Sequence, residues 1–71
     1  MIDYSNFTDE ALEARLAELR LDHADLDAAI AALSNTTVPD LIVIGRLKRK
    51  KLAMKDEMAR IADFLNPDII A

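Results

Sequence analysis

The sequence contains no cysteine and only one histidine, His23. Without cysteine the chain cannot form disulfides or thiolate metal sites, and carboxylates are the only other metal ligands beside a single imidazole. We therefore expect neither a metal nor a cofactor. A chain of 71 residues buries only about 60% of its unfolded surface. Long helices or oligomerisation must then supply the stability that disulfides or metals give other small proteins.

Tryptophan is also absent, and aromatic residues make up 4% of the chain. So few rings argue against a ligand pocket and against a platform on which nucleic acid bases stack. The longest aliphatic run, residues 41–44, is far shorter than the ~20 residues of a membrane-spanning helix. Residues 1–5 show neither the basic nor the apolar region of a secretory signal. The sequence predicts a soluble, cytoplasmic protein that binds no membrane.

Glycine and proline are scarce, whereas alanine, leucine and charged residues dominate, as in long helices and coiled coils. A first helix is predicted over about residues 8–33. Thr8 can cap it, and two acids follow in the first turn. Large apolar residues, with His23 among them, then follow one another at alternating intervals of 4 and 3 residues, as in a heptad repeat. They form a seam along one face of the helix. The seam consists of Leu12, Leu16, Leu19, His23, Leu26, Ile30 and Leu33.

A loop is predicted over residues 34–37 and a second helix over about 38–65. Thr37 is the predicted cap, Pro39 fits the first turn, and Asp40 stands three residues after Thr37, as in a capping box. The dipeptide Asn66-Pro67 ends the helix, because the residue before proline disfavours the helical conformation. Intervals of 3 and 4 again define a seam, formed by Ile44, Leu47, Lys51, Met54, Met58, Ile61 and Leu65.

The short loop makes the two helices antiparallel neighbours. Folding the chain about the loop matches the two seams layer by layer and places His23 opposite Lys51. Residues 8–33 carry a net charge of −5 and residues 38–65 a net charge of +3, which supports the same pairing. We predict an all-α fold: residues 1–71 form a single domain, a two-helix antiparallel coiled-coil hairpin that assembles into a homodimeric four-helix bundle. Six apolar residues of the two ends are predicted to close its open end: Ile2, Tyr4, Phe7, Phe64, Ile69 and Ile70.

Two stretches carry a family pattern. Residues 23–30 read H-x-x-L-D-x-x-I, and residues 47–57 read L-K-x-x-K-L-x-M-K-D-E. Together they resemble the YdcH-like family of small bacterial proteins, which usually has leucine at the position of Met54. The resemblance covers roughly residues 10–60. It implies a cytoplasmic helical hairpin that is often oligomeric, and it implies no activity, because the family has no established one.

His23 and Lys51 are predicted to form one polar layer in the seam. A polar layer in a coiled coil usually sets register or oligomeric state. Catalysis or metal binding at His23 would need a concave site, whereas Asp22 and Asp27 nearby lie on solvated helices. No carboxylate pair, glycine-rich loop or nucleophile motif points to chemistry. We therefore predict that the protein is not an enzyme.

A second stripe beside the seam of the second helix is the candidate partner interface. It includes Leu41, Lys48, Leu52 and Lys55, continued by Ala59 and Ala62. The first helix has a comparable stripe of small residues, namely Ala17, Ala24, Ala28 and Ala31. A hairpin buries one face of each helix, so these stripes predict packing against an unidentified protein partner or a second copy. The predicted function is that of a small interaction module.

The basic run from Arg46 to Lys55 leaves an alternative open. It would suit a nucleic-acid-associated protein that contacts phosphates through Arg46, Arg49 and Lys50. The net charge of −4 and the absence of aromatic residues within the run argue against this function. The preferred interpretation is a solvated flank that pairs with the acidic first helix.

Overall fold

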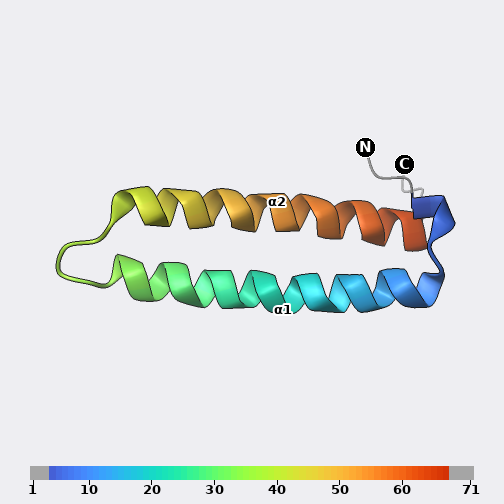
Figure 1. Ribbon diagram of the computed structural model, residues 1–71, viewed down its shortest axis with the longest axis horizontal. Helices are drawn as coiled ribbons and strands as arrows, with labels where there is room; N and C mark the ends of the chain where they lie inside the picture. Colours follow the sequence, from blue (N-terminus) through green and yellow to red (C-terminus); the bar gives the residue numbers. More distant parts are fainter. Residues whose placement is uncertain (1–3, 68–71) are drawn as a thin grey trace.

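The computed structural model describes residues 4–67 and has two long helices lying side by side (Figure 1). A short 3-10 helix, η1 (Tyr4–Asn6), precedes α1 (Asp9–Ser34) and α2 (Leu41–Leu65). The helices run antiparallel, joined by a loop at one end, while η1 lies beside the end of α2 at the other (Figure 1). The predicted all-α, two-helix hairpin is confirmed.

The start of α1 follows from its cap. The hydroxyl oxygen of Thr8 accepts a hydrogen bond from the backbone N–H of Ala11 at 3.1 Å, as the sequence predicts. The helix ends at Ser34, where the N–H of Asn35 donates to the carbonyls of Ala31 and Ala32. Thr36 then donates its hydroxyl proton to the carbonyl oxygen of Leu33 at 2.9 Å. The backbone of Asn35 and the side chain of Thr36 thus satisfy carbonyls that the helix end leaves unpaired.

The start of α2 corrects a prediction, because Asp40 caps this helix and Thr37 does not. One carboxylate oxygen of Asp40 accepts from the N–H groups of Ile42 and Val43, both at 3.1 Å. The helix therefore begins at Leu41 rather than near residue 38. Pro39 contributes to the shift because it disfavours the helical conformation at Val38. The backbone of Asp40 is itself extended, with φ −82° and ψ 96°. A carboxylate at the positive helix end is also a stronger acceptor than a hydroxyl.

The core is built from the two predicted seams and is densest toward the open end of the hairpin. Leu19 and Ile61 are 1% and 0% exposed, and Leu12 and Leu16 are buried in the same cluster. Met54, Met58 and Leu65 pack against that cluster. Toward the loop only Ile44 is buried, while its seam neighbours stay half-exposed.

Aromatic residues close the open end, as the sequence predicts. Tyr4 in η1 is 9% exposed and belongs to the buried cluster. Its ring lies 5.9 Å from that of Phe64 and 6.3 Å from that of Phe7, between centroids. The tilted contact with Phe64 holds η1 against the end of α2. Ile2, Ile69 and Ile70, also predicted for this cluster, lie outside the described residues.

Candidate interaction surface

One polar layer interrupts the apolar seam in the middle of the hairpin. The ammonium nitrogen of Lys51 donates to Asp27 Oδ1 at 2.6 Å, and Nδ1 of His23 lies 3.8 Å from Asp27 Oδ2. Asp27 therefore joins the two predicted seam residues, a role that the sequence did not assign to it. The hydrogen bond from Lys51 lowers the pKa of the Asp27 carboxyl, and the charges of Lys51 and His23 lower it further against the effect of partial burial.

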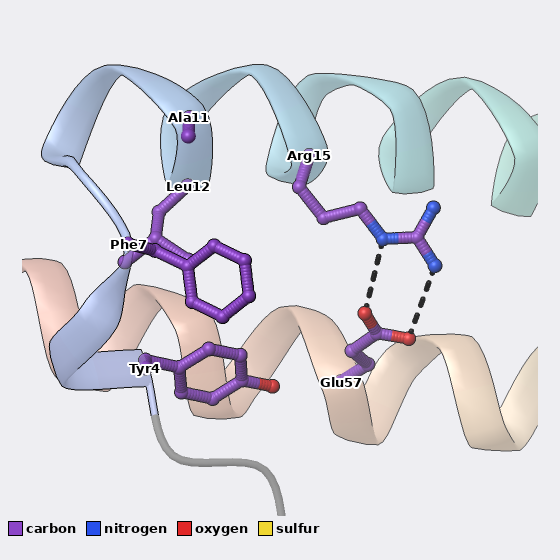
Figure 2. Close-up of a pocket in the computed structure, with 6 residues that line it drawn as sticks. All are labelled: Tyr4, Phe7, Ala11, Leu12, Arg15 and Glu57. Atoms are coloured by element: carbon purple, nitrogen blue, oxygen red, sulfur yellow. Dashed lines mark hydrogen bonds and ion pairs between the residues drawn. The ribbon is translucent and has the colours of Figure 1, made fainter.

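A second interhelical contact fixes the register nearer the open end. Arg15 donates from Nε and Nη2 to the two carboxylate oxygens of Glu57, at 3.1 and 3.4 Å (Figure 2). Arg15 also bonds to Glu18 one turn along α1. The hydrogen bond to Glu57, followed by that to Glu18, raises the pKa of Arg15. Both Arg15 and Glu57 directly precede a seam residue, which is the signal that could have predicted their contact.

Beside this ion pair lies an open hollow of about 380 Å³, formed where η1 meets α1. The rings of Tyr4 and Phe7, with Ala11 and Leu12, form most of its wall (Figure 2). The charged groups at its edge, Arg15 and Glu57, are bonded to each other. Within the described residues the Tyr4 hydroxyl has no hydrogen-bond partner. The hollow lacks the nucleophile, base and oxyanion donor that a hydrolytic site combines.

The predicted partner interface lies on an exposed side of α2, called here the lateral face. Leu41 is 76% exposed and Leu52 is 59% exposed. Lys48 and Lys55 are exposed beside them, and neither has an ion-pair partner in the described part of the chain. The full lateral face follows intervals of 4 and 3. It consists of Leu41, Gly45, Lys48, Leu52, Lys55, Ala59 and Ala62.

The exposed side of α1 forms a longer apolar seam than the predicted stripe of four alanines. Leu21, 64% exposed, stands at its centre and was not predicted to belong to it. This outer seam is Ala14, Ala17, Leu21, Ala24, Ala28 and Ala31, all exposed and spaced by 3 and 4. The regular spacing was a signal available in the sequence. The spacing was not distinctive, because alanine is common in helices whether or not it belongs to an apolar face.

The basic run of α2 is mostly unpaired, which corrects the preferred interpretation of a flank neutralised by α1. Of its six bases, Lys51 alone forms an ion pair among residues 4–67. Arg46, Arg49 and Lys50 are exposed and have no ion-pair partner in the part of the chain that the structure describes. The positive charge of α2 is therefore available to a partner outside the hairpin.

Residues 4–67 contain no group of three or more histidine, aspartate or glutamate side chains arranged to hold a metal ion. Neither α1 nor α2 contains a stretch long and apolar enough to cross a membrane.

The fold and its surfaces define a small antiparallel α-helical hairpin with one polar seam layer and exposed apolar helix faces. The chain belongs to the DUF465 family, whose description is 'protein of unknown function'. The family model matches residues 16–62. This match confirms the resemblance to the YdcH-like small helical proteins. It indicates no catalytic family. No curated protein and no solved structure matches the chain significantly.

Proposed function

We propose that this protein is a non-catalytic interaction module of the cytoplasm, which acts by docking its exposed helix faces onto a protein surface. The observation that carries the proposal is the exposure of Leu41 and Leu52 on the lateral face, beside Lys48 and Lys55, which have no ion-pair partner among residues 4–67. An apolar patch rimmed by charges is typical of a protein interface. The lysines would steer the encounter toward an acidic surface.

The balance between buried and exposed apolar residues supports the same proposal. Six hydrophobic residues are buried in residues 4–67, whereas seven large ones are exposed. Small domains with so limited a core commonly gain stability from oligomerisation. The homodimeric four-helix bundle expected from the sequence is part of this proposal, because it would cover the helix faces that the hairpin leaves open.

Photo-crosslinking in living cells tests the proposal. A photoreactive side chain replaces Leu52. A matched variant carries it at Ala53, which is also exposed but lies outside the lateral face. A discrete crosslinked protein product from position 52, absent from position 53, is the expected result. A product at neither position would contradict the proposed function.

The unpaired bases favour a second candidate, binding to nucleic acid through Arg46, Arg49 and Lys50. The observation that favours it is their exposure without ion-pair partners in the described residues. Contact with phosphates makes affinity fall steeply as salt rises, whereas apolar docking persists. Titration of a DNA or RNA duplex at low and at physiological salt separates the two functions. Duplex binding that weakens steeply as salt rises and is still about micromolar at physiological salt would favour the nucleic acid over the protein partner.

A further inference from the structure

The loop end of the hairpin presents three large apolar side chains, called here the loop tip. Val38, in the loop, is 85% exposed, and Leu41 and Ile42, in the first turn of α2, are 76% and 73% exposed. The Cβ atoms of a helix lean toward its N-terminus, so the side chains of Leu41 and Ile42 lean toward the loop. The loop lies at one extreme of the long axis (Figure 1). One end of a rod-shaped molecule therefore carries apolar surface that the hairpin does not bury.

A ring of bases surrounds α2 directly behind the loop tip. This basic collar consists of Arg46, Lys48, Arg49 and Lys50, all exposed and without an ion-pair partner among residues 4–67. At about 3.6 residues per turn the four bases spread over about 200° of the helix circumference, on the sides that α1 leaves open. Arg46 lies about 6 Å behind Ile42 at about 1.5 Å per residue. The bases therefore encircle the helix rather than line one of its faces.

Charge is divided along the long axis of the hairpin. Residues 28–50, on the loop side of the Lys51–Asp27 ion pair, contain four bases and one acid, a net charge of +3. That acid is Asp40, whose carboxylate accepts two N–H groups at the positive end of α2. Asp25 on α1 lies roughly level with the collar, because Asp27 contacts Lys51. By contrast, residues 4–27 contain two bases and seven acids, a net charge of −5.

We propose that the loop tip docks on a lipid surface with anionic headgroups, so that the hairpin stands end-on. The apolar side chains enter the boundary between headgroups and acyl chains, roughly 5–10 Å deep, and the basic collar contacts the headgroups. The inference goes beyond the proposed function, because it uses the end of the hairpin rather than its lateral face. It departs from the sequence-based prediction that the chain binds no membrane. That prediction depended on the lack of a spanning segment and of a signal, and neither is needed for contact through a tip.

Electrostatic screening selects the end-on orientation. The net charge of −4 opposes contact between the whole chain and an anionic surface. Interactions between exposed charges fade within a Debye length, which is about 8 Å at physiological salt. Because Arg15 contacts Glu57, the acids of residues 9–18 lie about 20 Å or more behind Ile42, at about 1.5 Å per residue. A hairpin that stands on its loop tip brings the collar to the surface and keeps these acids out of range.

The shape of the loop tip favours a lipid surface over other partners. Two packed helices end in an area of about 200 Å², whereas a standard protein interface covers about 800 Å² per partner. A lipid surface sets no such minimum, because apolar side chains insert between its molecules. A nucleic acid duplex would meet the bases on one face of α2. A plane that lies just behind the loop tip meets the whole collar.

Sedimentation with lipid vesicles tests the inference on the purified chain. We expect binding to phosphatidylcholine vesicles that contain about a third phosphatidylglycerol, and little binding to phosphatidylcholine alone. Ile42→Ser and Arg49→Gln should each weaken binding by about fivefold or more. Leu21→Ser and Arg60→Gln are the matched controls, because both residues are exposed but lie far behind the loop tip. No binding to the anionic vesicles, or equal losses in test and control variants, would overturn the inference.

Tryptophan fluorescence tests the orientation, since the chain has no tryptophan of its own. The emission of Val38→Trp should shift to the blue on anionic vesicles, and brominated acyl chains should quench it. Leu21→Trp, the control, should show neither effect. A tryptophan at position 38 that stays in water while the protein is bound would overturn the inference. A shift at position 52 as large as that at position 38 would place the lateral face flat on the lipid and would also overturn it.

The same variants separate this inference from the proposed function. Val38 and Ile42 lie outside the lateral face, so Ile42→Ser should leave the protein crosslink from position 52 unchanged. Vesicle binding without that crosslink would support the inference and contradict the proposed function. A crosslink from position 52 without vesicle binding would do the reverse. A protein product crosslinked from position 42, again without vesicle binding, would assign the loop tip to a protein partner and overturn the inference.

Discussion

Single buried side chains decide how much stability this small core provides. Leu19 is 1% exposed and touches the cluster of Leu12, Leu16 and Ile61. Replacing it with alanine removes buried methyl groups and leaves a cavity in a core of few residues. We expect Leu19→Ala to lower the free energy of unfolding by about 2–5 kcal/mol.

Urea denaturation followed by circular dichroism, at one fixed protein concentration, measures this loss. Ile42→Ala is the matched control, because Ile42 is 73% exposed and its truncation should change stability by less than about 0.5 kcal/mol. Equal losses in the two variants would contradict the burial pattern described for the seam.

The cap of α2 offers a second test at the residue scale. Asp40→Ala removes the acceptor for the N–H groups of Ile42 and Val43, at an expected cost of about 1 kcal/mol. Thr37→Ala should be nearly neutral, because Thr37 caps nothing in the structure. The same urea titration compares the two variants. A larger loss for Thr37→Ala would restore the start near residue 38 that the sequence alone suggests.

The contact between helices through Asp27 makes part of the stability depend on pH. Hydrogen bonding from Lys51 lowers the pKa of Asp27 below its ordinary value of 3.8. A carboxyl group with a depressed pKa stabilises the fold fully above its unfolded pKa, and this contribution disappears as the pH falls through the folded pKa. The difference in unfolding free energy between the wild type and Asp27→Asn should therefore be constant above pH 3.8 and should shrink at lower pH.

Thermal unfolding of both proteins across the acid range measures this difference. Asp56→Asn is the control, since Asp56 is exposed and has no ion pair in the described residues. Its effect on stability should not follow the same curve. A difference for Asp27→Asn that stays constant through the acid range would mean that the interhelical contact is not formed in solution.

For the whole molecule, the core is uneven along the long axis. The buried cluster of Tyr4, Leu12, Leu16, Leu19 and Ile61 lies in the half away from the loop, and Ile44 is the buried residue nearest the loop. Local opening is easiest where few apolar contacts hold the helices together. We expect amide hydrogen exchange in the dilute monomer to be slowest around Leu19 and Ile61 and faster around Leu33 and Leu47.

Hydrogen exchange followed by mass spectrometry at peptide resolution measures this gradient. Repeating it at high protein concentration adds a control for self-association, because a dimer should protect α2 around Gly45 and Leu52 further. Uniform protection along both helices in the dilute protein would show that the loop half is as firmly packed as the open end.

The sequence by itself determined the helices, their antiparallel pairing and the residues of the seam. Each of these depends on a local signal in the sequence. The signals are the repeated 3–4 spacing of apolar residues, a cap at Thr8 and a turn before Pro39. An error at one position does not alter a pattern that recurs at seven positions along each helix. The same redundancy made the family recognisable from two short stretches.

The tertiary structure alone decided which individual side chains meet. Asp27 joins His23 and Lys51, and Glu57 holds Arg15, because a carboxylate can reach partners up to a turn above or below its own layer. Asp40 replaced Thr37 as the cap because Pro39 disfavours the helical conformation before it and the Asp40 carboxylate reaches two N–H groups of the first turn. The exposed seam with Leu21, and the basic run left unpaired, emerged only once the hairpin showed which sides it buries. Periodicity fixes the direction of a helix face, whereas contact between two groups depends on register and on the reach of their side chains.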